Sequence, residues 1–286
     1  MSKLAVMGWP VGLRGARSWP GLPKRRVLGC AALIGGFVAA AAAAADPQSA
    51  SAALRMAESA AGANAAGATG SAIEWKFTLG QYRTPTEGTA TDLNLRGSLG
   101  ATTFWLGHYT GADGFRQARA GLERWHELPV GRLLTTVQVA EGRYLNGSVN
   151  LEAGQGELKA LLGFSRTNLR EYYNIDFNSN DSFTVGAAVD QANGGRWSLY
   201  AVQDNRTGPG QRLTHLNYRP AYLGDHRLTI DLFHRYGAVP WRDRRVSVSG
   251  ATVTFDYRPV FVRLAYDPKV NFTAVNMWRL SVGTHF

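Results

Sequence analysis

The most constraining feature of this sequence is a repeated alternation of apolar and polar residues between Ile73 and Phe286. Side chains of a β-strand point alternately to its two faces, so a period of two indicates strands with one apolar and one polar face. The alternating segments are roughly nine to eleven residues long, the length that a tilted strand needs to cross the hydrocarbon of a membrane. The pattern therefore predicts membrane-spanning strands.

Fourteen such segments follow one another along the chain. They predict strands at 73–83, 91–99, 101–109, 115–126, 131–140, 144–153, 157–166, 182–190, 196–205, 211–219, 226–235, 245–257, 260–267 and 276–286. Twelve strands are an alternative, because the segments 115–126 and 245–257 alternate poorly. The predicted fold is an all-β, antiparallel transmembrane barrel. A soluble β-sandwich is the competing architecture, but it would turn the apolar face inward.

The segments between the predicted strands also follow a pattern, since short turns rich in Gly, Pro and Asn alternate with longer loops. In transmembrane barrels the short turns lie on one side of the membrane and the longer loops on the other. An even number of strands then places both ends of the barrel on the side of the short turns.

The last predicted strand carries the most specific signature. Apolar residues alternate there with polar or small ones, and the chain ends on the aromatic Phe286. This ending resembles the closing strand of bacterial outer-membrane β-barrel proteins of the porin-like class, although Thr284 departs from the usual aromatic or aliphatic residue. The resemblance implies a location in the bacterial outer membrane and recognition of the terminal aromatic by the barrel-assembly machinery.

The beginning of the chain agrees with export. Lys24, Arg25 and Arg26 precede an apolar run that ends in small residues before Asp46, so residues 1–45 are interpreted as a secretory signal peptide. A transmembrane helix is the alternative, because the run approaches the roughly 20 apolar residues of a span. Cys30 is the only cysteine, but the apolar run follows it, which disfavours a lipoprotein signal. Residues 46–72, rich in Ala, Gly and Ser, are predicted to be a disordered periplasmic segment before the barrel at 73–286.

The basic character of the chain belongs mostly to the predicted signal peptide. The whole sequence has a formal net charge of +10, which would suggest a nucleic-acid partner. Residues 1–45 contain six basic residues and no acidic ones, so the remainder has 25 basic and 21 acidic residues and a net charge of +4. We therefore expect no nucleic-acid partner. Without Cys30 the chain also lacks a cysteine nucleophile and a thiolate metal site.

The alternation separates a face for lipid from a face for the lumen. Apolar residues such as Phe77, Leu93 and Val262 fall on the lipid side, and charged residues fall on the other. The strongest candidate site is a lumenal ladder that guides anions, formed by Lys76, Arg96, Arg263 and Arg279 with the acidic partners Glu74, Asp92, Glu152 and Asp231. The alternative is that these charges neutralise one another and fill a closed barrel.

Aromatic residues near the ends of the predicted strands are typical of girdles at the two membrane interfaces. The expected members are Tyr82, Tyr109, Trp125, Tyr144, Tyr218, Tyr257, Tyr266 and Trp278.

Two predicted loops carry residues suited to binding. Tyr172 and Tyr173 lie in the longest one, which is expected to fold inward as a constriction. Arg242, Arg244 and Arg245 form a basic cluster that could contact phosphates of lipopolysaccharide or an anionic solute. An ordinary solvated loop is the alternative for this cluster.

The histidines are too scattered to predict a metal site, and no motif predicts a cofactor. An enzyme would need a site assembled from separate strands, with His108, His234 and Asp204 as its external participants. The leading hypothesis is instead an outer-membrane channel for small, anionic solutes, with outer-membrane lipids and lipopolysaccharide as its surroundings. The alternatives are an enzyme acting on lipid or a surface substrate, and a structural barrel or the outer-membrane component of an export system.

Overall fold

The computed structural model describes residues 72–168, 181–204, 210–239 and 244–286. The predicted signal peptide, the lipoprotein and transmembrane-helix alternatives and nearly all of the predicted disordered segment lie outside these residues. Within them, no helix combines the length and apolar character that a membrane span requires.

The described residues form fourteen strands, as the alternation predicted. They are β1 (Glu74–Thr84), β2 (Gly88–Leu99), β3 (Thr102–Thr110), β4 (Arg116–Leu128), β5 (Gly131–Ala140), β6 (Tyr144–Ala153), β7 (Leu158–Thr167), β8 (Asp181–Asp190), β9 (Arg196–Asp204), β10 (Arg212–Arg219), β11 (His226–Ala238), β12 (Arg245–Tyr257), β13 (Val260–Asp267) and β14 (Met277–His285). The twelve-strand alternative is wrong, because β4 and β12 are both regular members of the sheet.

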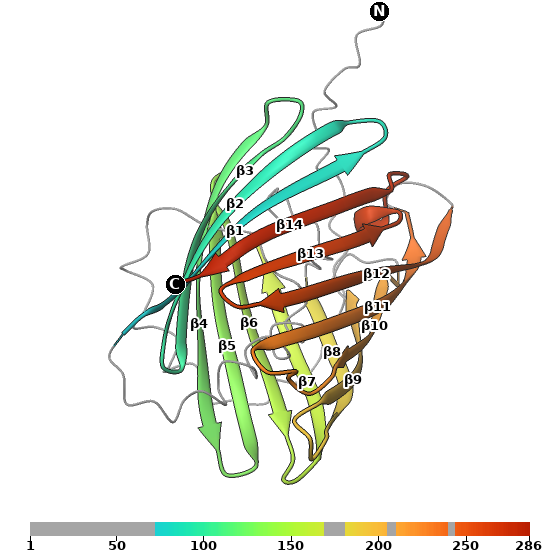
Figure 1. The fold of residues 1–286 in the computed structure, drawn as a ribbon. Helices are drawn as coiled ribbons and strands as arrows, with labels where there is room; N and C mark the ends of the chain where they lie inside the picture. Colours follow the sequence, from blue (N-terminus) through green and yellow to red (C-terminus); the bar gives the residue numbers. More distant parts are fainter. Residues whose placement is uncertain (1–71, 169–180, 205–209, 240–243) are drawn as a thin grey trace, which may run out of the picture. The chain divides into compact units, whose positions relative to one another are not determined.

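The strands close into a single antiparallel barrel in which each strand pairs with its neighbours in sequence (Figure 1). The barrel closes where β1 pairs with β14, from Lys76 opposite His285 to Arg83 opposite Trp278. The last residue extends this seam, since the backbone groups of Trp75 and Phe286 exchange hydrogen bonds of 2.9 and 3.0 Å. Each of the fourteen described strands therefore has two hydrogen-bonded neighbours, so this sheet has no open edge toward lipid.

The two ends of the barrel differ in their connections. The end that we name the turn end has the connections 100–101, 129–130, 154–157, 191–195, 220–225 and 258–259. The opposite end, the loop end, has 85–87, 111–115, 141–143, 168–180, 205–211, 239–244 and 268–276, the last with the 3-10 helix η1 (Val270–Phe272). β1 begins and β14 ends at the turn end. In outer-membrane barrels short turns face the periplasm.

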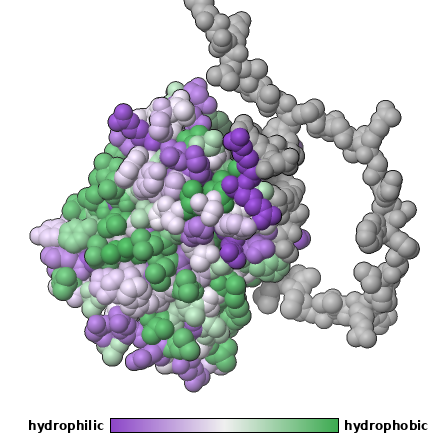
Figure 2. Space-filling model, turned by 90° about the vertical axis from the view of Figure 1, so that its right-hand side faces the viewer, coloured by the Kyte–Doolittle hydropathy of each residue, from purple (hydrophilic) through white to green (hydrophobic). Residues whose placement is uncertain are grey.

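The outward face of the barrel is apolar. Its exposed large side chains include many that the alternation assigned to lipid, such as Phe77, Leu93, Leu99, Leu145, Val149, Phe183, Val185, Val189, Leu232, Val260, Val262 and Leu264. Figure 2 shows apolar residues gathered over much of one side of the barrel. An apolar exterior of this extent is unfavourable in water, so the fold is that of a transmembrane barrel.

The predicted aromatic girdle is half correct. Trp278 and Tyr257 are exposed on the outward face, but four other members are wrong, because they are buried and point into the barrel: Tyr82, Tyr109, Trp125 and Tyr144. Tyr82 shares its face with the lumenal Thr78, and Tyr144 shares its face with Asn146. Alternate residues of a strand face the lumen and the lipid in turn. This alternation, and not closeness to the end of the strand, decides which face an aromatic residue occupies.

Several inward aromatic rings lie over a glycine directly opposite on the neighbouring strand. Trp105 faces Gly121, where a Cβ atom would come within 2.2 Å of the indole. The same arrangement joins Phe233 to Gly250 at 2.3 Å. Because the glycines have no side chain, the rings rest against the wall of the barrel.

Candidate functional site: the charged lumen

The inward face of the strands is rich in charge, and its charges are distributed unevenly along the barrel. Eight inward basic residues lie within three residues of a strand terminus at the turn end: Lys76, Arg96, Arg132, Lys159, Arg196, Arg219, Arg227 and Arg263. Five inward acidic residues lie in the same zone: Glu74, Glu127, Glu152, Asp190 and Asp256. Farther along the described strands the balance is reversed, with Arg119, Arg235 and Arg279 against Asp92, Glu123, Asp204, Asp231 and Asp267. The turn end of the lumen is thus the basic end.

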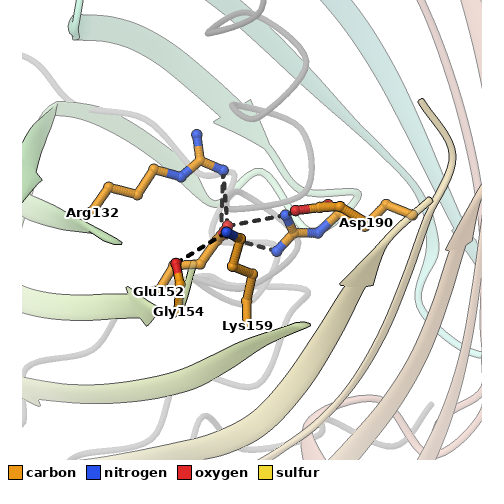
Figure 3. Close-up of polar contacts among 6 residues, drawn as sticks. Arg132, Glu152, Gly154, Lys159 and Asp190 are labelled. Carbon is orange, nitrogen blue, oxygen red and sulfur yellow. Dashed lines mark hydrogen bonds and ion pairs between the residues drawn. The ribbon is translucent and has the colours of Figure 1, made fainter. Parts of the chain in front are cut away.

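Glu152 is the centre of an ion-pair cluster at the turn end (Figure 3). Arg196 donates from Nη1 to Oε1 at 3.0 Å and from Nη2 to Oε2 at 2.9 Å. Arg132 donates from Nη2 to both carboxylate oxygens at 3.3 Å. Arg196 Nη1 also lies 3.0 Å from Asp190 Oδ1. Both Glu152 and Arg196 are buried, with side-chain exposures of 3% and 4%.

This cluster joins strands that are not neighbours. Glu152 lies on β6 and Arg196 on β9, so their contact passes over β7 and β8 inside the barrel. Lys159 on β7 points into the same region and donates from Nζ to the carbonyl oxygen of Gly154 at 3.0 Å (Figure 3). Such charge-assisted hydrogen bonds between carboxylates and guanidiniums connect strands that are not neighbours in the sheet.

A second group connects β2 with β4 across β3. Arg119 donates to Asp92, which also accepts a hydrogen bond of 3.2 Å from Tyr82 Oη. Arg96 donates to Glu123 Oε1 at 2.9 Å. The indole of the intervening Trp105, on β3, donates to the same oxygen at 3.3 Å.

A third group lies on β10, β11 and β13. Arg235 donates from Nη1 to Asp267 Oδ1 at 2.7 Å and to the carbonyl oxygen of Pro268 at 2.5 Å. His215 Nδ1 lies 2.9 Å from Asp231 Oδ2, and its ring stacks on Tyr200 with a centroid distance of 4.8 Å. The ion pair between Arg235 and Asp267 neutralises charge inside the barrel.

The four basic residues of the predicted ladder lie on β2, β1, β14 and β13, which are consecutive strands of the barrel. All four belong to the inward face, and Lys76 and Arg96 are directly opposite each other. Arg263 donates from Nε to Thr254 Oγ1 at 3.0 Å, and Lys76 Nζ lies 4.3 Å from the centroid of the Phe261 ring. The ladder residues therefore share one wall of the lumen.

The acidic residues predicted as their partners have contacts outside the ladder. Asp92 pairs with Arg119, Glu152 with Arg196 and Arg132, and Asp231 with His215. Glu74 is exposed at the turn end. Asp92 also interacts electrostatically with Arg279 of the ladder, so the pairing of the four acids with the ladder stays a prediction.

The predicted loop residues are described only in part. Tyr172, Tyr173 and Arg242 lie outside the described residues. Arg244 is exposed at the loop end, and Arg245 begins β12 with its side chain outward. Arg245 Nη1 donates to Tyr236 Oη at 2.6 Å.

The proposed external participants of an enzyme do not meet. His108 and His234 are exposed on the outward face, whereas Asp204 is buried on the inward face of β9. His234 Nδ1 instead lies 3.0 Å from Ser249 Oγ, which is also outward. Among the described residues, no three His, Cys, Asp or Glu side chains are grouped so that they could hold a metal ion.

Solved structures of bacterial outer-membrane proteins resemble this barrel. Omp33 of Acinetobacter baumannii superimposes with a TM-score of 0.50 at 9% sequence identity, covering 76% of this chain and 100% of its own. OccAB3 of the same organism has a TM-score of 0.44 at 10% identity, covering 75% of this chain and 98% of its own. A triple mutant of Rhodopseudomonas blastica porin has 0.43 at 10% identity, covering 75% and 99%. The fold is that of an outer-membrane porin-like barrel. Neither a protein-family model nor a curated protein sequence matches the chain.

Several residues of this porin-like lumen were missed by the sequence reasoning. Arg132 and Arg196 stand at the beginnings of predicted strands, where parity alone would have assigned them to the lumen. Arg119 and Glu123 lie on β4, whose outward face also carries arginines, including the exposed Arg124. With polar residues on both faces, the sequence of β4 gave no signal for its orientation.

Proposed function

We propose that the protein is a channel of the bacterial outer membrane that passes small solutes and prefers anions. The observation that carries this proposal is the excess of basic over acidic side chains at the turn end of the lumen. Fixed positive charges along a pore raise the local concentration of anions and lower that of cations. Farther along the lumen acidic side chains outnumber basic ones, so the proposed preference is set at the turn end.

Measurement of ion currents across planar bilayers tests the proposal. In a potassium chloride gradient, the reversal potential of the wild-type barrel should indicate chloride preference. Replacing Arg263 and Arg279 with alanine should shift it toward zero, whereas replacing Arg212, which is exposed on the outward face, should not. A barrel that inserts but conducts no current would refute the channel, and a cation-selective wild type would refute the preference.

Contact with lipopolysaccharide is supported by a basic group on the outward face at the loop end. Arg212 lies directly opposite Tyr236, with its guanidinium 5.8 Å from the ring centroid. Arg245 approaches the same ring at 5.7 Å. Two guanidiniums beside an aromatic suit the phosphates of a lipid headgroup. Lipopolysaccharide that remains bound to the purified barrel should decrease after Arg212→Ala with Arg245→Ala, but not after Arg124→Ala toward the turn end.

Recognition by the barrel-assembly machinery is supported by the C-terminus. Phe286 is 69% exposed, while its backbone completes the seam with Trp75. An aromatic residue at the end of β14 with an exposed ring is suited to recognition before the seam between β1 and β14 closes. Phe286→Ala should lower the amount of assembled barrel in cells without changing the stability of refolded protein. Equal loss in both measurements would contradict a role in recognition.

A further inference from the structure

Arg219 is a buried cation whose guanidinium lacks the partners that buried arginines usually have. It ends β10 at the turn end of the lumen and is 5% exposed. Two of its guanidinium nitrogens, Nε and Nη1, are buried and have no hydrogen-bond partner. Burying a charge is costly unless hydrogen bonds and an opposite charge compensate for it.

The neighbours of Arg219 add to its positive charge. Arg196 lies directly opposite on β9, and Arg227 points inward from β11. Both guanidiniums act electrostatically on Arg219. Arg227 donates from Nη1 to Tyr222 Oη at 2.6 Å, while its own Nε is buried without a partner. Three arginines on three consecutive strands thus face one region of the lumen.

The acidic groups nearby have contacts with residues other than Arg219. Glu152 is held by Arg196 and Arg132, and Asp190, which acts electrostatically on Arg219, lies 3.0 Å from Arg196 Nη1. Asp256 acts on Arg227 but belongs to β12, where His285 Nε2 lies 3.3 Å from it. Among the described residues, Nε and Nη1 of Arg219 and Nε of Arg227 therefore stay buried without a hydrogen-bond partner, although Asp190 and Asp256 act electrostatically on these two arginines.

We propose that Arg219 and Arg227, beside Arg196, bind an oxyanion of the phosphate class at the turn end of the lumen. A phosphate group carries a charge of about −1.5 to −2 and strong acceptor oxygens, which match the free donors of two guanidiniums. This proposal names the class of anion that the channel would bind. It rests on the proposed function, because an anion must enter the lumen before it can reach these arginines. The site gives a passing phosphate-bearing solute a place to bind after it has passed the ion-paired part of the barrel.

Calorimetric titration of the full chain, folded in detergent, with inorganic phosphate tests the site without requiring a current. Saturable binding is expected, and Arg219→Gln should weaken it about tenfold or more, since charge-assisted hydrogen bonds are lost. Arg219→Lys keeps the charge and should restore part of the affinity. Arg124→Gln is the matched control, because it removes the same charge from an exposed outward position nearer the turn end than the loop end.

Ion currents separate failure of the site from failure of the channel. Phosphate added on the turn-end side should reduce the chloride current of the wild type, and Arg219→Gln should abolish this block. A barrel without current that still binds phosphate in the titration would refute the channel and keep the site. Absence of saturable binding to the wild type, or equal binding to Arg219→Gln, would overturn the site even if chloride passes.

Discussion

Glu152 offers the sharpest test of whether the lumen is held together by buried charge. In Glu152→Gln the side chain keeps its size but loses its negative charge. Arg196 and Arg132 then lose the carboxylate that accepts all four of their hydrogen bonds to this position. One amide oxygen remains as an acceptor, while the amide N–H₂ group faces the guanidiniums as a second donor.

The size of the effect follows from burial and from the contacts that remain. Removing one partner of a buried ion pair costs about 3–5 kcal/mol, because the other charge stays desolvated. Arg196 keeps its contact with Asp190, and the Arg132 side chain is 16% exposed and therefore partly hydrated. We expect the lower end, a loss of about 3 kcal/mol in the free energy of unfolding. This corresponds to roughly a hundredfold change in the folding equilibrium constant.

Urea unfolding of barrels refolded in lipid vesicles, followed by tryptophan fluorescence, measures this loss. Glu157→Gln is the matched control, because it removes the same charge at the same end of the barrel from an exposed turn. A loss below about 0.5 kcal/mol for Glu152→Gln, or equal losses in the two variants, would refute a desolvated ion pair. The charge change should also increase chloride preference in both variants.

Two further pairs of variants test packing and the lipid face. Gly121→Ala should cost about 1–3 kcal/mol in unfolding free energy, because its Cβ must displace the indole opposite, whereas Gly147→Ala, with its nearest atom at 3.9 Å, should cost much less. Leu264→Arg should cost about 2–4 kcal/mol in bilayers, since it places a charge on the lipid face in the middle of a strand. Leu223→Arg, in a turn and 76% exposed, should change stability by less than about 0.5 kcal/mol. Urea unfolding measures these losses. Equal losses for Gly121→Ala and Gly147→Ala would contradict the close packing at Gly121, and equal losses for Leu264→Arg and Leu223→Arg would contradict the position of Leu264 in lipid.

Strand positions and faces were predictable because a transmembrane barrel imposes a simple rule on each strand. One face meets lipid and the other meets the lumen, so β6, for example, was predicted with the bounds that the structure has. The same rule placed Glu152 inside. The error with Tyr82 arose from using its position near a strand end in place of its parity.

The partners of the lumenal charges were not predictable in the same way. Register relates neighbouring strands only, whereas Glu152 on β6 reaches Arg196 on β9, and Asp92 on β2 reaches Arg119 on β4. Such contacts depend on the curvature of the closed barrel and on the length of each side chain. Neither is encoded in a local pattern of polarity.

The seam between β1 and β14 has a consequence for how the chain can be reconnected. Because Trp75 and Phe286 are joined through their backbones at the turn end, a short linker could fuse the two ends of the barrel domain. New termini opened at the connection 258–259 would give a circular permutant with the same strand order around the barrel. In that permutant Phe286 would be an internal residue of the sequence. Closure of the barrel between β1 and β14 would then no longer coincide with the C-terminal aromatic residue.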